Sequence, residues 1–268
     1  MTILRGILLA LLTGTVSASA QTIPAGGPVQ AMQTYGSVTI LGKSVNAGNK
    51  NKLSLARKRF YLFAGGVKEN TALIERINAT EITSRDCYYT QINASACLID
   101  WLAQENCETP FCRKIEKDDL TKVKEFEAAY NKGLPLYGRK PNIALDWVAN
   151  NLPVNIASGF YLQQKSSIQT ILKGQKPVES AMTTAAAALA TFANIPVGDK
   201  PGTFLVSNVL PVEVGNKSYV WICEVSVGGN KEVKLPLNIN TDPAKRTKGC
   251  TVTMKDLKTC STGTCEKK

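Results

Sequence analysis

The chain has 268 residues, which is long enough for one large domain or two ordinary ones with a substantial apolar core. It carries 32 Lys and Arg against 21 Asp and Glu, a formal net charge of +11, and it has no histidine. The lack of histidine excludes Ser-His-Asp and Cys-His nucleophilic sites and His-ligated catalytic zinc. Carboxylate pairs, lysine bases and Ser-Lys dyads remain open. The positive charge suits an anionic partner, but it equally suits a lysine-rich soluble surface.

The first twenty residues, 1–20, predict a secretory signal peptide. Arg5 precedes an apolar run at 6–12, and the small residues ASA at 18–20 form a cleavage pattern. The run is too short to span a bilayer, which takes about 20 apolar residues. No later stretch is apolar enough to do so. We therefore expect a mature chain without a transmembrane segment that is secreted, periplasmic or at the cell surface.

The next residues predict a leader and then strands. Residues 21–35 are rich in proline and glycine without periodicity, which predicts a flexible leader. Alternating apolar residues predict the first strands of a sheet within 36–66, separated by an exposed loop at 46–52. The second of these strands is expected to run through SLARKRFYLFAGG, at 54–66.

From residue 67 the apolar spacing changes to the period of an α-helix, so 67–175 predicts a mainly helical block. Helices are expected at 67–82, 95–107, 118–133, 143–153 and 159–172. In the third helix, Asp118 or Asp119 is the expected N-cap and Gly133 the expected stop.

Three large aromatic residues of this block, Trp101, Trp147 and Phe160, are expected in the apolar core rather than against a cofactor. No cofactor is predicted for the chain.

Strand patterns return after the helical block. Within 176–242, strands are expected at 188–196, 203–208, 218–227 and 232–239. The last segment, 243–268, is basic and cysteine-rich, and we expect disulfides to hold it down. Strands at both ends with helices between them predict an α+β fold, an antiparallel β-sandwich interrupted by a mainly helical, disulfide-containing insertion. The alternative is two independent domains, one mainly helical and one mainly β.

All eight cysteines lie beyond the predicted signal peptide, in two sets of four. The sets are Cys87, Cys97, Cys107 and Cys112, and Cys223, Cys250, Cys260 and Cys265. An even number in an exported chain predicts disulfides. Pairing within each set is the simplest expectation, and four cysteines allow three arrangements. The alternative is two zinc sites, since the two C-x4-C spacings are compatible with zinc, but export and the lack of C-x2-C pairs favour disulfides.

The strongest basic and aromatic cluster is ARKRFY, at 56–61. On a strand, Arg57, Arg59 and Tyr61 share one face, which could contact phosphates or an acidic polymer with Tyr61 stacking on it. The alternative is a solvated face whose arginine stems cover apolar surface. Nucleic acid is not an expected partner of an exported, disulfide-rich chain. The acids at 116–127 lie on a lysine-interleaved helix without the apolar setting that raises a catalytic acid's pKa.

The segment 191–208, TFANIPVGDKPGTFLVSN, contains a tight Pro/Gly corner. The corner lacks the G-x-x-x-x-G-K-[ST] spacing and no helix follows, so it predicts a turn rather than a phosphate loop. Phe192, Ile195 and Phe204 are expected to fill the core. Gly198 and Gly202 are expected to permit positive φ.

Residues 189–208 resemble the motif of carboxypeptidase-regulatory-like, transthyretin-type β-sandwich domains. In that motif a small residue precedes Phe, followed by Asn-Ile/Leu-Pro, a glycine and an aromatic residue within a strand. The matching positions are Ala190, Phe192, Asn194, Ile195, Pro196, Gly198, Gly202 and Phe204. The family's upstream Asp-x-x-Gly turn is replaced by TTAAAA at 183–188, and DKP at 199–201 lengthens the corner. The resemblance implies an accessory or spacer module of an exported protein without a catalytic site.

Three functional hypotheses follow. The first is a non-catalytic exported protein with a transthyretin-like β-sandwich and a binding or structural role at the cell envelope, its partner a cell-envelope protein or acidic polysaccharide. In it the helical insertion carries specificity. The second is a histidine-independent hydrolase, for example on glycans, which needs two facing carboxylates about 5 to 9.5 Å apart. The third is a basic binder of anionic surfaces or polysaccharide through Arg57, Arg59 and the C-terminal lysines, with salt-sensitive affinity.

Overall fold

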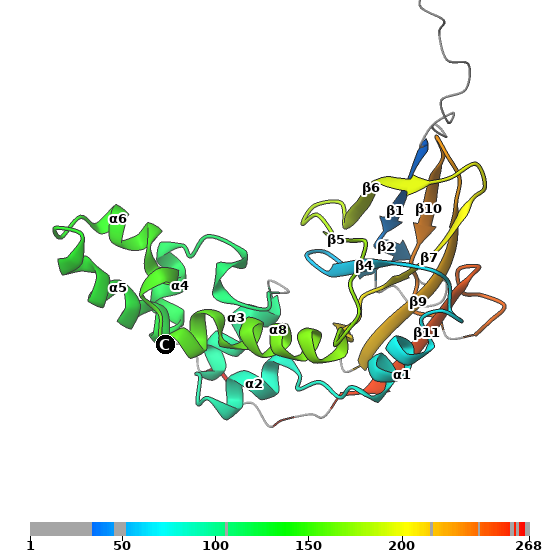
Figure 1. Ribbon diagram of the computed structural model, residues 1–268. Helices are drawn as coiled ribbons and strands as arrows, with labels where there is room; N and C mark the ends of the chain where they lie inside the picture. The colour runs from blue at the N-terminus through cyan, green and yellow to red at the C-terminus, as the bar shows by residue number, and fades with distance from the viewer. Residues whose placement is uncertain are drawn as a thin grey trace, which may run out of the picture. The chain divides into compact units, whose positions relative to one another are not determined.

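A computed structural model describes residues 34–45, 52–104, 107–214, 217–240, 242–257, 260 and 263–265 (Figure 1). The predicted signal peptide, nearly all of the predicted leader and most of the loop expected at 46–52 lie outside these residues. The described chain is a mixed α+β protein whose sheets are mainly antiparallel, which confirms the predicted fold class at that level. In the part of the chain described, no helix has the length and apolar composition needed to cross a membrane.

The strands form two main sheets and a small ribbon. They are β1 (Thr34–Leu41), β2 (Lys43–Val45), β3 (Lys52–Ser54), β4 (Arg59–Ala64), β5 (Glu179–Met182), β6 (Leu189–Val197), β7 (Gly202–Ser207), β8 (Val212–Val214), β9 (Lys217–Val227), β10 (Glu232–Pro236) and β11 (Cys250–Asp256). The first sheet has the order β10-β1-β6, and the second has the order β11-β9-β7-β4-β5 with β8 beside β9. The ribbon joins β2 to β3.

Strands far apart in the sequence pair in both sheets. β1 is antiparallel to β6 and parallel to β10, with Val38 opposite Phe192. β4 is antiparallel to β5 and β7, with Tyr61 opposite Ser207. The strands before the helices therefore pair with strands that follow them, as Figure 1 shows by the blue β1 beside the yellow β6.

The alternation along β4 places its side chains in two different cores. Phe60 and Leu62 belong to the core that both main sheets share, together with Phe192 and Trp221. Ile195 and Phe204 lie in the same core, so all three expected core residues of the segment 191–208 are confirmed. Tyr61 and Phe63 face the other way, where residues of the first and last helices cover them: Leu73, Ile77 and Ile171.

The helices lie between β4 and β5 in the sequence. They are α1 (Thr71–Ala79), α2 (Arg85–Gln91), α3 (Ala96–Gln104), α4 (Lys117–Lys122), α5 (Lys124–Leu136), α6 (Pro141–Asp146), α7 (Val148–Asn151) and α8 (Phe160–Ile171), with a 3₁₀ turn at Pro110–Cys112 and a π turn at Asn155–Gly159. They enclose a core of their own, in which Tyr89, Leu98, Trp101, Phe126 and Phe160 are buried. Trp101 and Phe160 thus confirm the expected core positions, whereas Trp147 is exposed at the end of α6.

The helix expected at 118–133 is two helices. Its N-cap is Glu116, not Asp118 or Asp119, and the Asp119 carboxylate accepts the Glu116 backbone N–H at 2.8 Å in a capping box. The helix is interrupted at Val123, whose backbone is extended, and α5 then continues past Gly133 to Leu136. The prediction that Gly133 ends the helix was wrong. This glycine instead permits close packing against α7, since a Cβ there would lie 2.5 Å from Nδ2 of Asn151, the last residue of α7.

Two expectations about the strand segments were wrong in detail. The strand expected at 54–66 begins at Arg59, because residues 55–58 form a turn in which Arg57 has φ of 59°. Gly198 and Gly202 do not adopt positive φ; in that region Asn194 does, at 53°. The corner does connect strands as predicted, carrying the chain from β6 in one sheet to β7 in the other. The C-terminal segment also contains an unpredicted strand, β11, paired with β9.

All eight cysteines form disulfides, which confirms the disulfide prediction and leaves no thiolate for the alternative zinc sites. Cys107–Cys112 and Cys223–Cys250 pair within their sets. The other two pairs join the sets, Cys87–Cys260 and Cys97–Cys265, so the expectation of pairing within each set was wrong for half of the cysteines. The reason is tertiary: the C-terminal segment reaches α2 and α3, and spacing along the chain does not report that proximity.

Candidate functional site

A cavity of about 880 Å³ lies beside the six-stranded sheet, bounded by α2 and α8. The turn before β4, the end of β5, residues 107–108 and the segment 208–214 complete its wall. This volume is within the range of cavities that hold small organic ligands. The cavity therefore brings the β strands and the helical block together around one space.

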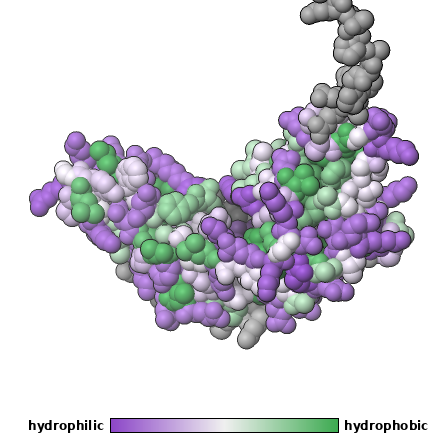
Figure 2. Space-filling model, viewed as in Figure 1, coloured by the Kyte–Doolittle hydropathy of each residue, from purple (hydrophilic) through white to green (hydrophobic). Residues whose placement is uncertain are grey.

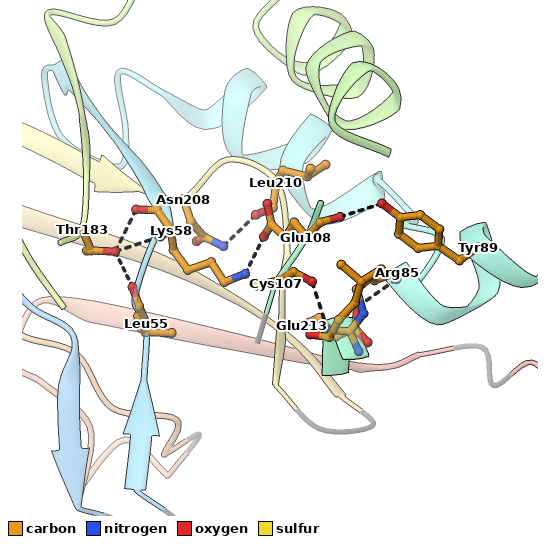
Figure 3. Close-up of polar contacts among 11 residues, drawn as sticks. Leu55, Lys58, Arg85, Tyr89, Cys107, Glu108, Thr183, Asn208, Leu210 and Glu213 are labelled. Carbon is orange, nitrogen blue, oxygen red and sulfur yellow. Dashed lines mark hydrogen bonds and ion pairs between the residues drawn. The ribbon is translucent and has the colours of Figure 1, made fainter. Parts of the chain in front are cut away.

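Thr183 holds the turn that supplies one wall. Its hydroxyl accepts the backbone N–H of Lys58 at 2.8 Å and donates to the Leu55 carbonyl oxygen (Figure 3). The Arg57 N–H also donates to the Thr183 carbonyl oxygen at 3.1 Å. These bonds satisfy buried backbone groups of a turn that no ladder covers. They hold Arg57 and Lys58 at the cavity.

The wall at 208–211 is a strained turn. The Leu210 N–H donates to the Asn208 carbonyl oxygen at 2.6 Å around Val209, whose φ is 59°. A β-branched residue in this region is a conformational outlier, and such outliers persist only where surrounding contacts enforce them. The Asn208 side chain provides those contacts, donating to the carbonyl oxygens of Leu210 (2.8 Å) and Tyr219 (3.0 Å) and accepting the Trp221 N–H (2.8 Å).

Two cations of the cavity wall are neutralised by acids. Lys58 forms an ion pair with Glu108, whose carbonyl oxygen accepts the Tyr89 hydroxyl at 3.2 Å (Figure 3). Arg85 pairs with Asp86 at 2.7 Å and also donates to the carbonyl oxygen of Cys107 at 3.3 Å. The Lys58–Glu108 pair ties the turn before β4 to the segment that follows α3, and the Arg85–Cys107 hydrogen bond ties α2 to the same segment.

Three further cations line the cavity without an acidic partner in the described part of the chain: Arg57, Arg59 and Lys165. The only side-chain hydrogen bond of Arg59 among the described residues is to the Ser180 hydroxyl, at 3.3 Å. Tyr161, on the same helix as Lys165, also lines the cavity and lies close enough to Tyr61 to influence its pKa. The wall thus combines unneutralised cations with aromatic rings.

The residues predicted as an anion contact, Arg57, Arg59 and Tyr61, all line this cavity. They do not form one exposed strand face, since Arg57 lies in the turn and Tyr61 is largely buried. Burial raises the pKa of the Tyr61 hydroxyl, which therefore stays protonated. Their contact with an anion stays a prediction.

The sequence did not predict several residues of the cavity wall. The most important of them are Arg85, Lys165, Asn208 and Glu213. None belongs to a local motif, and each comes from a different element. The one signal in the sequence was that Lys165 is the single charged residue of α8. No spacing rule would have linked it to Arg57.

Glu213 is the acid of the wall that has no ion pair in the described residues. It accepts the Arg85 backbone N–H at 3.0 Å. Burial raises the pKa of its carboxyl group above the ordinary value, despite the opposing influence of Arg85 and Lys58. A carboxyl group in this setting can hold a proton at a higher pH than an exposed one.

The acids at 116–127 lie outside this cavity, and two of them, Asp119 and Glu125, have structural roles. Asp119 pairs with Arg113 at 2.9 Å, and Glu125 accepts the Ser95 backbone N–H and hydroxyl, each at 2.6 Å. No group of three or more Cys, Asp or Glu side chains is arranged to hold a metal ion among the described residues. Comparisons of the chain with protein-family models, with curated proteins and with solved structures gave no match.

Proposed function

We propose that this protein is an exported, non-catalytic binding protein whose cavity holds an organic anion. In this proposal a transthyretin-like β-sandwich provides one wall, and the helical block inserted between its strands provides the other. The ligand class is a fragment of acidic polysaccharide or a similar carboxylate- or sulfate-bearing molecule at the cell envelope.

The observation that carries the proposal is the set of unneutralised cations Arg57, Arg59 and Lys165 around one cavity. The wall holds five cations and three acids, so its charge is positive even with Glu213 ionised. Guanidinium groups bind carboxylates and sulfates through paired hydrogen bonds. Tyr161 and Phe160 supply flat apolar surface for the body of a ligand, as in other cavities for small molecules.

Two features favour binding over catalysis. The chain has no histidine, and the acids Asp86 and Glu108 are each held by a neighbouring cation. The turn that carries Arg57 is held by the buried Thr183 hydroxyl, and the turn at 208–211 of the same wall is held by the buried Asn208 side chain. Such preorganised walls reduce the entropy lost on binding.

Titration calorimetry with oligogalacturonates, and with uncharged maltooligosaccharides for comparison, tests the proposal. We expect binding of the acidic sugars only, with affinity that falls as salt rises from about 20 to 300 mM. The Arg57→Gln, Arg59→Gln double variant should weaken binding at least about tenfold, since hydrogen bonds to charged groups are each worth about 1.5–3 kcal/mol.

The matched control is the Lys200→Gln, Lys248→Gln double variant, which removes the same charge from exposed positions outside the cavity. Its affinity should match that of the wild type. Equal losses in both double variants, or binding that salt does not affect, would contradict a role for the cavity.

A second candidate, a histidine-independent glycan hydrolase, is favoured by one observation. Glu213 has a raised pKa and lies close enough to Asp86 for the two carboxyl groups to interact. That combination resembles an acid and a carboxylate partner in glycoside hydrolysis. Incubation of the protein with a panel of glycans tests this candidate. If the wild type hydrolyses a glycan and Glu213→Gln binds it without hydrolysing it, the hydrolase candidate replaces the binding proposal.

A further inference from the structure

The loop between α5 and α6 and the helix ends beside it carry a concentration of positive charge outside the cavity. From 128 to 145 the chain has three exposed cations, Lys132, Arg139 and Lys140, and no Asp or Glu. The next acid, Asp146, is already paired with Lys114 at 2.8 Å. The end of these helices is therefore cationic without local compensation.

The same helix ends expose large apolar side chains. Leu136 is 67% exposed and Trp147 47% exposed, and Ile143 is exposed as well. Figure 2 shows hydrophobic surface over α5 and α6 bordered by hydrophilic residues. Isolated exposed apolar residues are ordinary, but a cluster framed by charge marks an interaction site.

The backbone brings Ile143 and Tyr137 to Trp147. The Trp147 N–H donates to the Ile143 carbonyl oxygen at 3.2 Å, so the two side chains lie one helical turn apart on one face. Gly138 and Arg139 have positive φ, 63° and 58°, and reverse the chain between α5 and α6. As a result the rings of Tyr137 and Trp147 lie 6.3 Å apart.

We propose that this basic-aromatic tip, residues 132–147, binds the surface of a membrane rich in anionic phospholipid. Trp and Tyr favour the interface between headgroups and acyl chains, and Leu136 and Ile143 add apolar area that can enter it. The three cations match the negative headgroups. The binding is peripheral, because α5 has 13 residues and is too short to span a bilayer.

Charge argues for this occupant over a second copy of the chain. A symmetric dimer through the tip would bring together two copies of one cationic patch whose single acid, Asp146, is already paired with Lys114. Like charges at close range oppose such an interface, whereas an anionic surface neutralises them. The tip is separate from the cavity, because none of its residues lines the cavity wall.

The chain contains its own reporter for this interaction. Trp101 and Trp221 are buried, so Trp147 is the one tryptophan whose environment can change when a surface covers the tip. Transfer of an exposed indole into a lipid interface shifts its fluorescence emission to shorter wavelength. The signal therefore locates the contact as well as detecting it.

The experiment uses the mature full-length chain with vesicles of phosphatidylglycerol and phosphatidylcholine in equal parts, and with pure phosphatidylcholine vesicles. We expect co-sedimentation and a blue shift with the anionic vesicles alone, both reduced by salt. Arg139→Gln with Lys140→Gln should weaken binding on the order of 10- to 30-fold. Leu136→Gln should weaken it by about tenfold.

Controls separate this proposal from its rivals. Leu162→Gln replaces a leucine of α8 that is 48% exposed, and Lys200→Gln with Lys248→Gln removes two exposed cations outside the tip; both variants should bind as the wild type does. The Arg57→Gln, Arg59→Gln variant should also bind normally, so a failure of the cavity proposal leaves this one intact. Equal binding to both vesicle types, equal losses in the control variants, or lipid-independent dimerisation that Leu136→Gln abolishes would overturn it.

Discussion

At the scale of single residues, buried polar side chains decide the form of the cavity. Thr183 and Asn208 are both almost fully buried, and each satisfies backbone groups of a turn that lacks ladder partners. A buried backbone group without a partner costs about 1–3 kcal/mol, so these side chains select the observed turns over alternatives. The positions of Arg57 and of the strained Val209 depend on them.

Glu213 should make the stability of the protein depend on pH. Burial raises the pKa of its carboxyl group above the ordinary 4.5, so the folded state favours the protonated form. The corresponding stabilisation is complete below about 4.5 and is lost as pH rises through the pKa of the folded state. In Glu213→Gln the amide oxygen can still accept the Arg85 N–H, and nothing ionises.

We therefore expect the free energy of unfolding of Glu213→Gln to increase relative to that of the wild type as pH rises from about 4 to 7. Urea unfolding at a series of pH values measures the difference. A difference that is constant over this range would show that the Glu213 carboxyl group titrates normally.

At the scale of elements, tertiary contacts place the helix boundaries at other residues than the local sequence signals predict. Glu116 rather than Asp118 or Asp119 caps α4, because Asp119 is engaged by Arg113 and by the Glu116 N–H. Burial alone would raise the pKa of Asp119, but the hydrogen bonds from Arg113 and Glu116 outweigh it and hold the pKa below its usual value. The carboxylate is thus stabilised in its ionised form.

Asp119→Ala should destabilise the protein by about 1–2 kcal/mol at pH 7, because it removes the capping box and the pair with Arg113. Asp118→Ala is the control, since the Asp118 side chain forms no hydrogen bond or ion pair with the described residues and its interaction with the helix dipole is worth a few tenths of a kcal/mol. The Asp119 stabilisation is present above the ordinary pKa of 3.8 and is lost as pH falls. Equal effects of the two substitutions in urea unfolding would refute the assignment.

At the scale of the whole described chain, two disulfides join the C-terminal segment to the helices. Cys87–Cys260 spans 173 residues and Cys97–Cys265 spans 168. Long closed loops remove the most conformational entropy from the unfolded chain. These two bonds should therefore stabilise the fold more than Cys107–Cys112, which spans 5 residues.

In the chain-entropy relation, either long loop closed alone contributes about 5 kcal/mol and the loop of 5 residues about 2 kcal/mol. Because Cys97–Cys265 remains in a variant that lacks Cys87–Cys260, the latter bond closes a ring of about 15 residues, which is worth about 3 kcal/mol. Replacing Cys87 and Cys260 by alanine should lower the free energy of unfolding more than replacing Cys107 and Cys112. Urea unfolding of both double variants under non-reducing conditions measures this. A larger loss from the short loop would mean that native contacts, rather than chain entropy, dominate.

The sequence by itself determined that strands flank a helical block, and it determined three residues of the central core. Phe192, Ile195 and Phe204 could be predicted because alternation along a strand follows from local geometry. The even cysteine count likewise predicted disulfides. These properties depend on neighbours within a few positions, and the sequence records such neighbours directly.

Only the tertiary structure decided the disulfide connections, the helix boundaries and the cavity. Arg57 was recognisable as a candidate contact, but its place beside Lys165 and Glu213 depends on how β4, α8 and β8 pack. The same holds for Cys87 and Cys260, which no spacing rule connects. Contacts between distant segments arise from the packing of the whole chain, and a single sequence carries no local pattern that reports them.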